Sequence, residues 1–269
     1  MNVSAWHLRK RDTVVLTLCA AFLISTLGAA GESGRRRAKE FVCQANLRQW
    51  SVIFDGYLDR NKGKFIQADL CTAYYWVRGL KEADKDWKRL RIWLCPEAEV
   101  PAFDEAGKAA PRPSVFAAWG VYTGADYGPN GLAGSYGING YLVPFGFGTY
   151  EGGVPGTEGW YNLREVPEAS TVPMFVDALR FDMWPLETNP PTSNEFAAWS
   201  GNNMARCCIN RHDGTVNCLF VDGSVRKVGL KELWTLKWHW SFNTAGPWTK
   251  AGGVQPEDWP EWTRPFKDY

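Results

Sequence analysis

The sequence predicts an α+β protein with one long N-terminal helix, a small antiparallel β-sheet and large irregular loops. A helical pattern runs from near Asp12 to Tyr57. Two Asp-Gly pairs, each between apolar runs near the C-terminus, are typical of tight hairpins. With 269 residues and 45% hydrophobic content, the chain is large enough to bury a substantial core. These observations predict a single folded domain that follows the first half of the helix.

The first half of the helix has the composition of a membrane span. Residues 13–30 are eighteen residues without a charge. At 1.5 Å per residue they cover about 27 Å, against roughly 30 Å for a bilayer core. The basic cluster His7–Arg11 precedes them, which favours a cytoplasmic N-terminus. We therefore expect a single-pass protein of the cell membrane, with residues 1–12 cytoplasmic, 13–31 transmembrane and 32–269 extracytoplasmic, in the periplasm or at the cell surface.

Two alternatives remain for this N-terminal segment. A secretory signal peptide has a basic start, an apolar run and a small-residue cleavage site, and Gly28-Ala29-Ala30 has the composition of such a site. The segment could also be an ordinary buried helix. The membrane prediction makes the lipid bilayer the first expected partner.

The second half of the helix is predicted to pack inside the domain and to end at about residue 58. Its apolar side chains recur at steps of four and three, which places them on one helix face. This stripe contains Cys43, Leu47, Trp50, Phe54 and Tyr57. Five more apolar residues, Phe41, Val42, Ala45, Val52 and Ile53, are expected to widen the buried face.

The middle of the chain, residues 97–203, is predicted to be a loop-rich insert. Glycine is frequent between Trp119 and Gly159, which favours irregular surface structure. One short buried strand is predicted at Val172–Asp177. The turn at Asp59–Gly63 resembles the start of a calcium loop, but no glutamate closes it, so we interpret it as a solvated turn.

The C-terminal region is predicted to contain a three-stranded meander over residues 205–228. The expected strands are Ala205–Asn210, Thr215–Val221 and Ser224–Val228, joined at the two Asp-Gly pairs. His212 is expected to fix the first turn by bonding backbone, and Asp222 the second. Residues 229–269 are predicted to form a short terminal helix, Leu230–Trp238, and a tail.

The composition argues against several classes of function. A net charge of +1 does not fit a nucleic-acid surface. The chain contains three histidines, His7, His212 and His239, and no motif that assembles a nucleophile, a base and an orienting group. No cofactor or metal motif is evident, because Cys207-Cys208 and Cys218 lack the spacing of a zinc site. We therefore predict that the protein is not an enzyme.

Six cysteines outside the apolar run suggest at least one disulfide, because export to an oxidising compartment permits it. Cys207 or Cys208 with Cys218 is the preferred pair, since a hairpin brings neighbouring strands close. Cys43, Cys71 and Cys95 could form another, and the sequence does not assign it.

Several blocks resemble a large family of bacterial prepilin-like proteins with an H-X9-DG signature near the C-terminus. His212 is followed after nine residues by Asp222-Gly223, within RHDGTVNCLFVDGSVRKV. The helix segment CQANLRQW and the blocks WLCP, SYGIN and PMFVD are also similar to the family pattern. The resemblance implies a pilin-like fold and a structural subunit of a type IV pilus-like filament, a type II secretion-like pseudopilin assembly or another surface assembly. Its helix would associate with other copies or with pilin-like subunits.

The start of the helix departs from that family pattern. Processed members have a glycine before the cleaved bond and a glutamate inside the span. The processing site here is degenerate, because Asp12 stands in place of the glycine, Thr13 follows it, and Thr17 stands in place of the glutamate. The expected product is an uncleaved anchor, in which Asp12 would cap the helix. The fifteen tryptophans support an alternative function, a membrane-anchored or secreted surface protein that binds a glycan by ring stacking.

Overall fold

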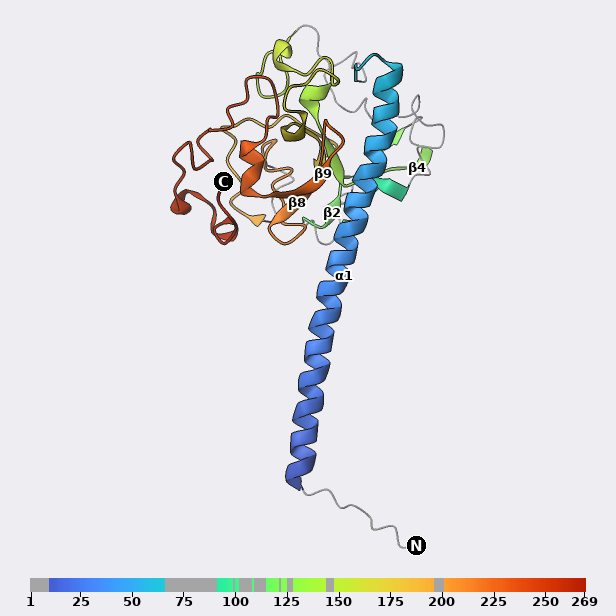
Figure 1. Cartoon of the computed structure of the whole chain (residues 1–269), viewed down its shortest axis with the longest axis vertical. Helices are drawn as coiled ribbons and strands as arrows, with labels where there is room; N and C mark the ends of the chain where they lie inside the picture. Colours follow the sequence, from blue (N-terminus) through green and yellow to red (C-terminus); the bar gives the residue numbers. More distant parts are fainter. Residues whose placement is uncertain are drawn as a thin grey trace. The chain divides into compact units, whose positions relative to one another are not determined.

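The computed structural model describes residues 10–65, 91–98, 100–101, 108, 115–120, 122–124, 128–143, 148–195 and 201–269. Side chains are described throughout these ranges except for residues 10–17, 19–30, 91, 122–124 and 128–131. The chain divides into two compact units, Met1–Lys39 and Glu40–Tyr269. Only the second unit contains strands among the described residues (Figure 1).

The first element is a continuous helix, α1 (Lys10–Arg60). Among the residues that the structure describes, no helix is both long and apolar enough to cross a membrane. The predicted span at residues 13–31 and the single-pass membrane localisation are therefore wrong. Over its length α1 carries charged residues at both ends and in its middle, where Arg35, Arg36 and Arg37 are exposed.

The predicted core stripe of α1 is confirmed. Cys43, Leu47 and Phe54 are fully buried, and Trp50 and Tyr57 nearly so. Ile53 is partly buried against the core as predicted, but the rest of the wider buried face is wrong, because Phe41, Val42, Ala45 and Val52 are exposed, Val52 at 74%. A helix lying on a sheet buries about one stripe of its surface, and these residues fall outside it.

The main sheet has five strands in the order β7-β5-β6-β8-β9. The strands are β5 (Tyr136–Asn139), β6 (Pro173–Asp177), β7 (Asp182–Met183), β8 (Thr215–Phe220) and β9 (Val225–Gly229). Neighbours pair antiparallel except β5 and β7, which pair parallel. The predicted strand at Val172–Asp177 is confirmed as β6. The predicted pilin-like fold with a small antiparallel sheet is wrong, because the sheet is mixed and the helix contains no membrane span.

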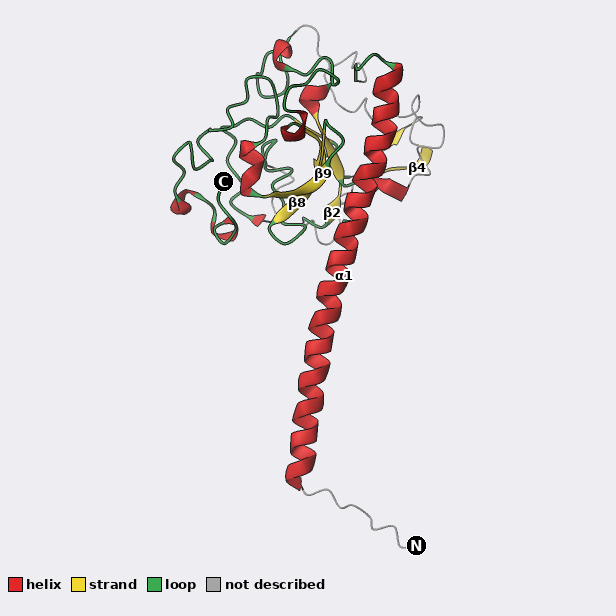
Figure 2. Cartoon of the chain, viewed as in Figure 1, coloured by secondary structure: helices red, strands yellow, loops and turns green. Residues whose placement is uncertain are grey.

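Two small sheets and several 3-10 turns complete the described elements, and loops make up much of the remainder (Figure 2). β1 (Val100–Pro101) pairs with β2 (Ala117–Ala118), and β3 (Tyr122–Gly124) pairs with β4 (Gly128–Leu132). The 3-10 helices are η2 (Arg91–Trp93), η3 (Gly140–Leu142), η4 (Gly156–Glu158), η5 (Ala169–Thr171), η7 (Lys231–Thr235), η8 (Pro256–Asp258) and η9 (Glu261–Thr263). The insert is less superficial than predicted, because β5 is buried at all four residues.

The three-stranded meander is only partly confirmed. β8 and β9 form the hairpin across Asp222-Gly223, with Gly223 at φ +83°. Residues 205–210 form turns instead of a strand, with Cys208 N donating to Met204 O at 2.9 Å. The edge of β8 that they would have joined is occupied by β6. Residues 205–210 thus form a local turn, and β6, which is more distant in the sequence, pairs with β8 in their place.

The C-terminal residues pack on the β8–β9 hairpin. The predicted helix at Leu230–Trp238 is the shorter 3-10 helix η7. Phe266 lies against Gly214 so closely that a Cβ there would be 2.6 Å from the ring, and the Tyr269 hydroxyl approaches Gly229 in the same way. Lys231 Nζ pairs with Asp268 Oδ1 at 2.6 Å. The last residues of the chain therefore cover glycines of the sheet.

We expect Phe54→Ala to lower the free energy of unfolding by about 3–5 kcal/mol, because it leaves a cavity between α1 and the sheet. Phe54 stacks on Phe175 of β6 with ring centroids 5.1 Å apart. The matched control is Val52→Ala, two residues away on the exposed face, which should change stability by less than about 0.5 kcal/mol. Urea unfolding measures both. Equal effects of the two variants would contradict the described orientation of α1.

Candidate functional site

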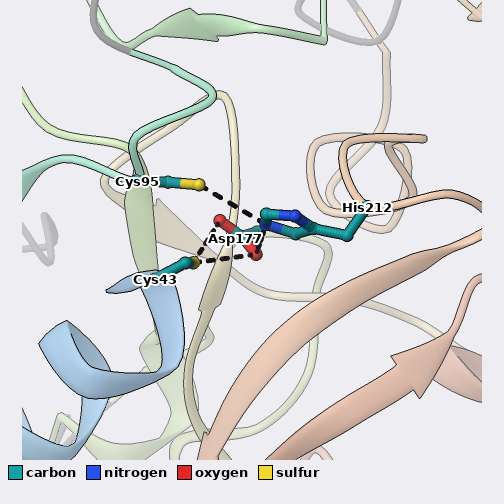
Figure 3. A group of neighbouring side chains, drawn as sticks. All are labelled: Cys43, Cys95, Asp177 and His212. Carbon is teal, nitrogen blue, oxygen red and sulfur yellow. Dashed lines mark hydrogen bonds and ion pairs between the residues drawn. The ribbon is translucent and has the colours of Figure 1, made fainter. Parts of the chain in front are cut away.

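Four side chains from distant parts of the sequence meet beneath α1 (Figure 3). Cys43 belongs to α1, Cys95 follows η2, Asp177 ends β6, and His212 precedes β8. The two thiol sulfurs, a carboxylate oxygen and an imidazole nitrogen all lie within 4.8 Å of one another. All four residues are buried, and the most exposed of them, His212, is 5% exposed. We call this group the buried cluster.

Local structure explains how each member reaches the cluster. Cys43 is the first residue of the buried stripe of α1, and Asp177 is the last residue of a strand that is buried along its whole length. Cys95 is fixed where its N–H donates to Ser135 Oγ at 2.6 Å. His212 is held by the turn after it, where its N–H donates to Thr215 O at 3.1 Å. That turn contains Asp213 and Gly214, both at positive φ.

The contacts inside the cluster are short and directed. His212 Nε2 lies 3.1 Å from Asp177 Oδ2 and 3.4 Å from Cys95 Sγ. Cys43 Sγ lies 3.6 Å and 3.7 Å from the two oxygens of Asp177. The Tyr136 hydroxyl donates to Cys43 Sγ at 3.3 Å. The carboxylate of Asp177 is therefore the common partner of the group.

Arg211 completes the cluster as a fully buried cation. Its Nη1 donates to Asp177 Oδ1 at 3.1 Å and to Ser135 O at 2.9 Å. Its Nε and Nη2 donate to the carbonyls of Val115 and Ala117 at 2.9 Å and 3.0 Å. A buried guanidinium needs this number of acceptors to offset the loss of its hydration. Arg211 thus joins residues 115–117 to the main sheet.

The neighbouring charges decide the protonation of the cluster. Burial alone would raise the pKa of Asp177, but the charge and hydrogen bond of His212, together with Arg211, lower it to about 2. Burial would lower the pKa of His212, whereas Asp177 raises it to about 10. The pKa of Cys95 falls to about 7, because hydrogen bonds from Cys43 and His212 outweigh its burial. Burial raises the pKa of Cys43. An ionised Asp177 therefore lies beside a protonated His212, and Cys43 stays a neutral thiol.

The signature residues have two different surroundings. His212 was expected to bond the turn backbone, but its ring contacts Asp177 and Cys95 instead. The first turn is fixed by Asn210, whose Oδ1 accepts from Gly214 N at 2.8 Å. Asp222 fixes the second turn as expected, because its Oδ1 accepts from Ser224 N at 2.9 Å. The second turn borders an open hollow of about 180 Å³ beside α1.

The predicted disulfides are not formed among the cysteines whose side chains are described, although Cys43 and Cys95 meet in the buried cluster. The five cysteines whose side chains are described, Cys43, Cys95, Cys207, Cys208 and Cys218, carry free thiols, and Cys71 lies outside the described residues. Thus neither Cys207 nor Cys208 is bridged to Cys218. Asp12, Thr13 and Thr17 lie in the first turns of α1, and their side chains are outside the described part. Because α1 begins at Lys10, Asp12 is inside the helix and is not its cap.

Asp177 and Arg211 are the members that sequence reasoning missed. Asp177 stands at the end of an apolar run, VPMFVD, and Arg211 lies directly before the signature histidine. A carboxylate that ends a predicted buried strand needs a cationic partner. That rule could have marked Asp177, but it does not say which of the thirty lysines and arginines pairs with it.

Comparison of the chain with protein-family models, with curated proteins and with solved structures gave no match. The resemblance to prepilin-like proteins therefore rests on the sequence blocks alone.

We expect Arg211→Lys to lower the free energy of unfolding by about 3 kcal/mol, because one ammonium group cannot reach four acceptors in three directions. The control is Arg226→Lys. Arg226 pairs with Glu232 Oε1 at 2.7 Å and its side chain is 42% exposed, so the effect should be within about 0.5 kcal/mol. Thermal and urea unfolding report both. If Arg211→Lys left the free energy of unfolding unchanged, a positive charge would be sufficient at this position and the geometry of the guanidinium would not be required.

His239 lies in another part of the core and gives a pH dependence. Its ring packs against Tyr141 and Phe242, with centroids 4.7 Å and 5.4 Å away. Burial lowers the pKa of His239 to about 4. Between pH 6.5 and 4 the unfolded chain therefore binds a proton that the folded chain does not, so stability falls as the pH falls.

His239→Phe keeps an aromatic ring in place and removes this titration. The unfolding free energy of the wild type minus that of the variant should fall as the pH drops from 6.5 to 4 and stay constant above pH 7. Urea unfolding at a series of pH values measures it. Parallel pH profiles for the two proteins would show that His239 titrates normally in the folded state.

Proposed function

We propose that the chain is a non-catalytic structural subunit that self-associates through the exposed face of α1. The observation that carries the proposal is the distribution of exposed apolar side chains. Of the eight large hydrophobic residues exposed among the described ones, four lie on α1: Leu18, Phe41, Val42 and Val52. Isolated exposed hydrophobics are common, but a concentration on one helix is typical of an interaction surface.

The geometry of the helix places the main members of this set together. Phe41 and Val52 are eleven residues apart, which is about three helical turns. They therefore point in nearly the same direction, opposite the core stripe, and are 68% and 74% exposed. Val42 and Ala45 are exposed beside them. We call Phe41, Val42, Ala45 and Val52 the outer face of α1.

The buried cluster supports a structural role over a catalytic one. Catalysis by a cysteine, histidine and aspartate requires that a substrate reach the nucleophile. Cys43, Cys95 and Asp177 are completely buried. The cluster instead connects α1, β6 and the chain before β8, so the signature histidine contributes to packing.

The resemblance to H-X9-DG prepilin-like proteins gives the class of assembly that we propose, a filament or surface assembly of like subunits. This proposal includes neither a membrane anchor nor a pilin fold. The glycan alternative has less support. Among the tryptophans whose side chains the structure describes, only Trp240 is largely exposed, at 58%, and its ring contacts Trp160 edge-on. Sugar binding by stacking usually needs an open aromatic surface.

The test is the oligomeric state of the full chain. Light scattering after size exclusion should show association that grows with concentration, and Phe41→Glu with Val52→Glu should weaken it at least about tenfold, or about 1.4 kcal/mol. The control is Val100→Glu, which places the same charge on a residue of β1 that is 61% exposed. It should not change association. A wild-type chain that stays monomeric, or equal loss in the control, would contradict the proposal.

A further inference from the structure

We propose that the buried cluster is a structural zinc site in which Cys43, Cys95, Asp177 and His212 are the four ligands. This site goes beyond the assembly function, because it concerns what holds the folded unit together. The four donors come from separate elements, and their donor atoms lie within 4.8 Å of one another.

Three distances between donor atoms are close to those of a tetrahedral zinc centre, and all of them are below 4.8 Å. Zinc bonds of about 2.3 Å to sulfur and about 2.0 Å to nitrogen or oxygen place sulfur about 3.5 Å from nitrogen or oxygen, and nitrogen about 3.3 Å from oxygen. The Cys95 sulfur is 3.4 Å from the His212 nitrogen. Asp177 Oδ2 is 3.7 Å from the Cys43 sulfur and 3.1 Å from His212 Nε2. The donors therefore need only small shifts to coordinate one ion.

The kinds of donor also favour zinc. Thiolate and imidazole ligands suit Zn²⁺, whereas calcium and magnesium prefer a shell of oxygens. A structural zinc site is closed by four protein ligands and shielded from solvent. The burial of all four residues fits that type of site.

The charges of the cluster balance when zinc is present. Two thiolates and one carboxylate carry three negative charges. Zinc and the guanidinium of Arg211, which lies 3.1 Å from Asp177 Oδ1, carry three positive ones. Binding forms two zinc–sulfur bonds, one zinc–nitrogen bond and one zinc–oxygen bond. Each thiol releases a proton to solvent, as does His212 if it is protonated. A neutral group is far less costly to bury than an isolated charge.

Groups outside the four ligands hold them in position. The Tyr136 hydroxyl donates to Cys43 Sγ at 3.3 Å. Asn217 N donates to Asp177 Oδ2 at 2.8 Å, and Arg211 Nη1 donates to Oδ1. Such outer partners orient the ligands in known metal sites and contribute to metal affinity. The cluster thus has both shells of a structural site.

The test begins with the metal content of the full chain, expressed with zinc supplied and purified without chelator. Elemental analysis should find close to one zinc per chain, and Cys95→Ala should lower that ratio to about a tenth or less. Cys208→Ala is the matched control, because Cys208 is equally buried but lies outside the cluster. It should keep its zinc.

A second measurement covers the case in which Cys95→Ala does not fold. Wild-type protein stripped of zinc and loaded with Co²⁺ should show the strong visible bands of tetrahedral cobalt and the near-ultraviolet bands of thiolate ligation. Wild-type protein that binds neither zinc nor cobalt would overturn the proposal. Peptide mass analysis that finds a Cys43–Cys95 disulfide in the purified protein, or zinc retained in folded Cys95→Ala, would also overturn it.

Discussion

The buried ion pair between Asp177 and Arg211 is the constraint on which the rest of the folded unit depends. Both side chains are 0% exposed, and their atoms are 3.1 Å apart. Moving two charges out of water costs several kcal/mol per ion, so the pair is stable only if the other hydrogen-bonding groups of both side chains have partners. Their partners here are the carbonyls of Val115, Ala117 and Ser135, the Asn217 N–H and the His212 ring. Each of those partners must therefore lie where the pair requires it.

This constraint bears on the interval between His212 and Asp222-Gly223. His212 contacts Asp177 at one end of β8, and Asp222-Gly223 forms the turn at the other end. The nine residues between His212 and Asp222 are the first turn, the six-residue strand β8 and Val221. A strand of six residues is about 20 Å long. The interval of nine residues is therefore the length of one turn and one strand.

The sequence predicted the parts of the fold that follow from local patterns. The stripe Cys43 to Tyr57, the strand that became β6 and the hairpin at Asp222-Gly223 each depend on periodicity or turn chemistry within a few residues. The parallel strand β7 and the cluster do not, because Cys43 and Asp177 are 134 residues apart in the chain. Nothing in the local pattern states that Phe41 and Val52 stay exposed, since burial depends on which neighbours the helix meets. The cluster could be predicted only as separate candidates, and the long-range contacts joined them.

The contacts of the C-terminal tail bear on how the protein is made. Phe266 and Tyr269 cover Gly214 and Gly229, which both lie at the open end of the β8–β9 hairpin, and Lys250 N donates to Tyr269 O at 2.8 Å. During synthesis, these residues leave the ribosome after every strand of the sheet. The open end of the hairpin therefore stays uncovered until residues 266–269 have left the ribosome.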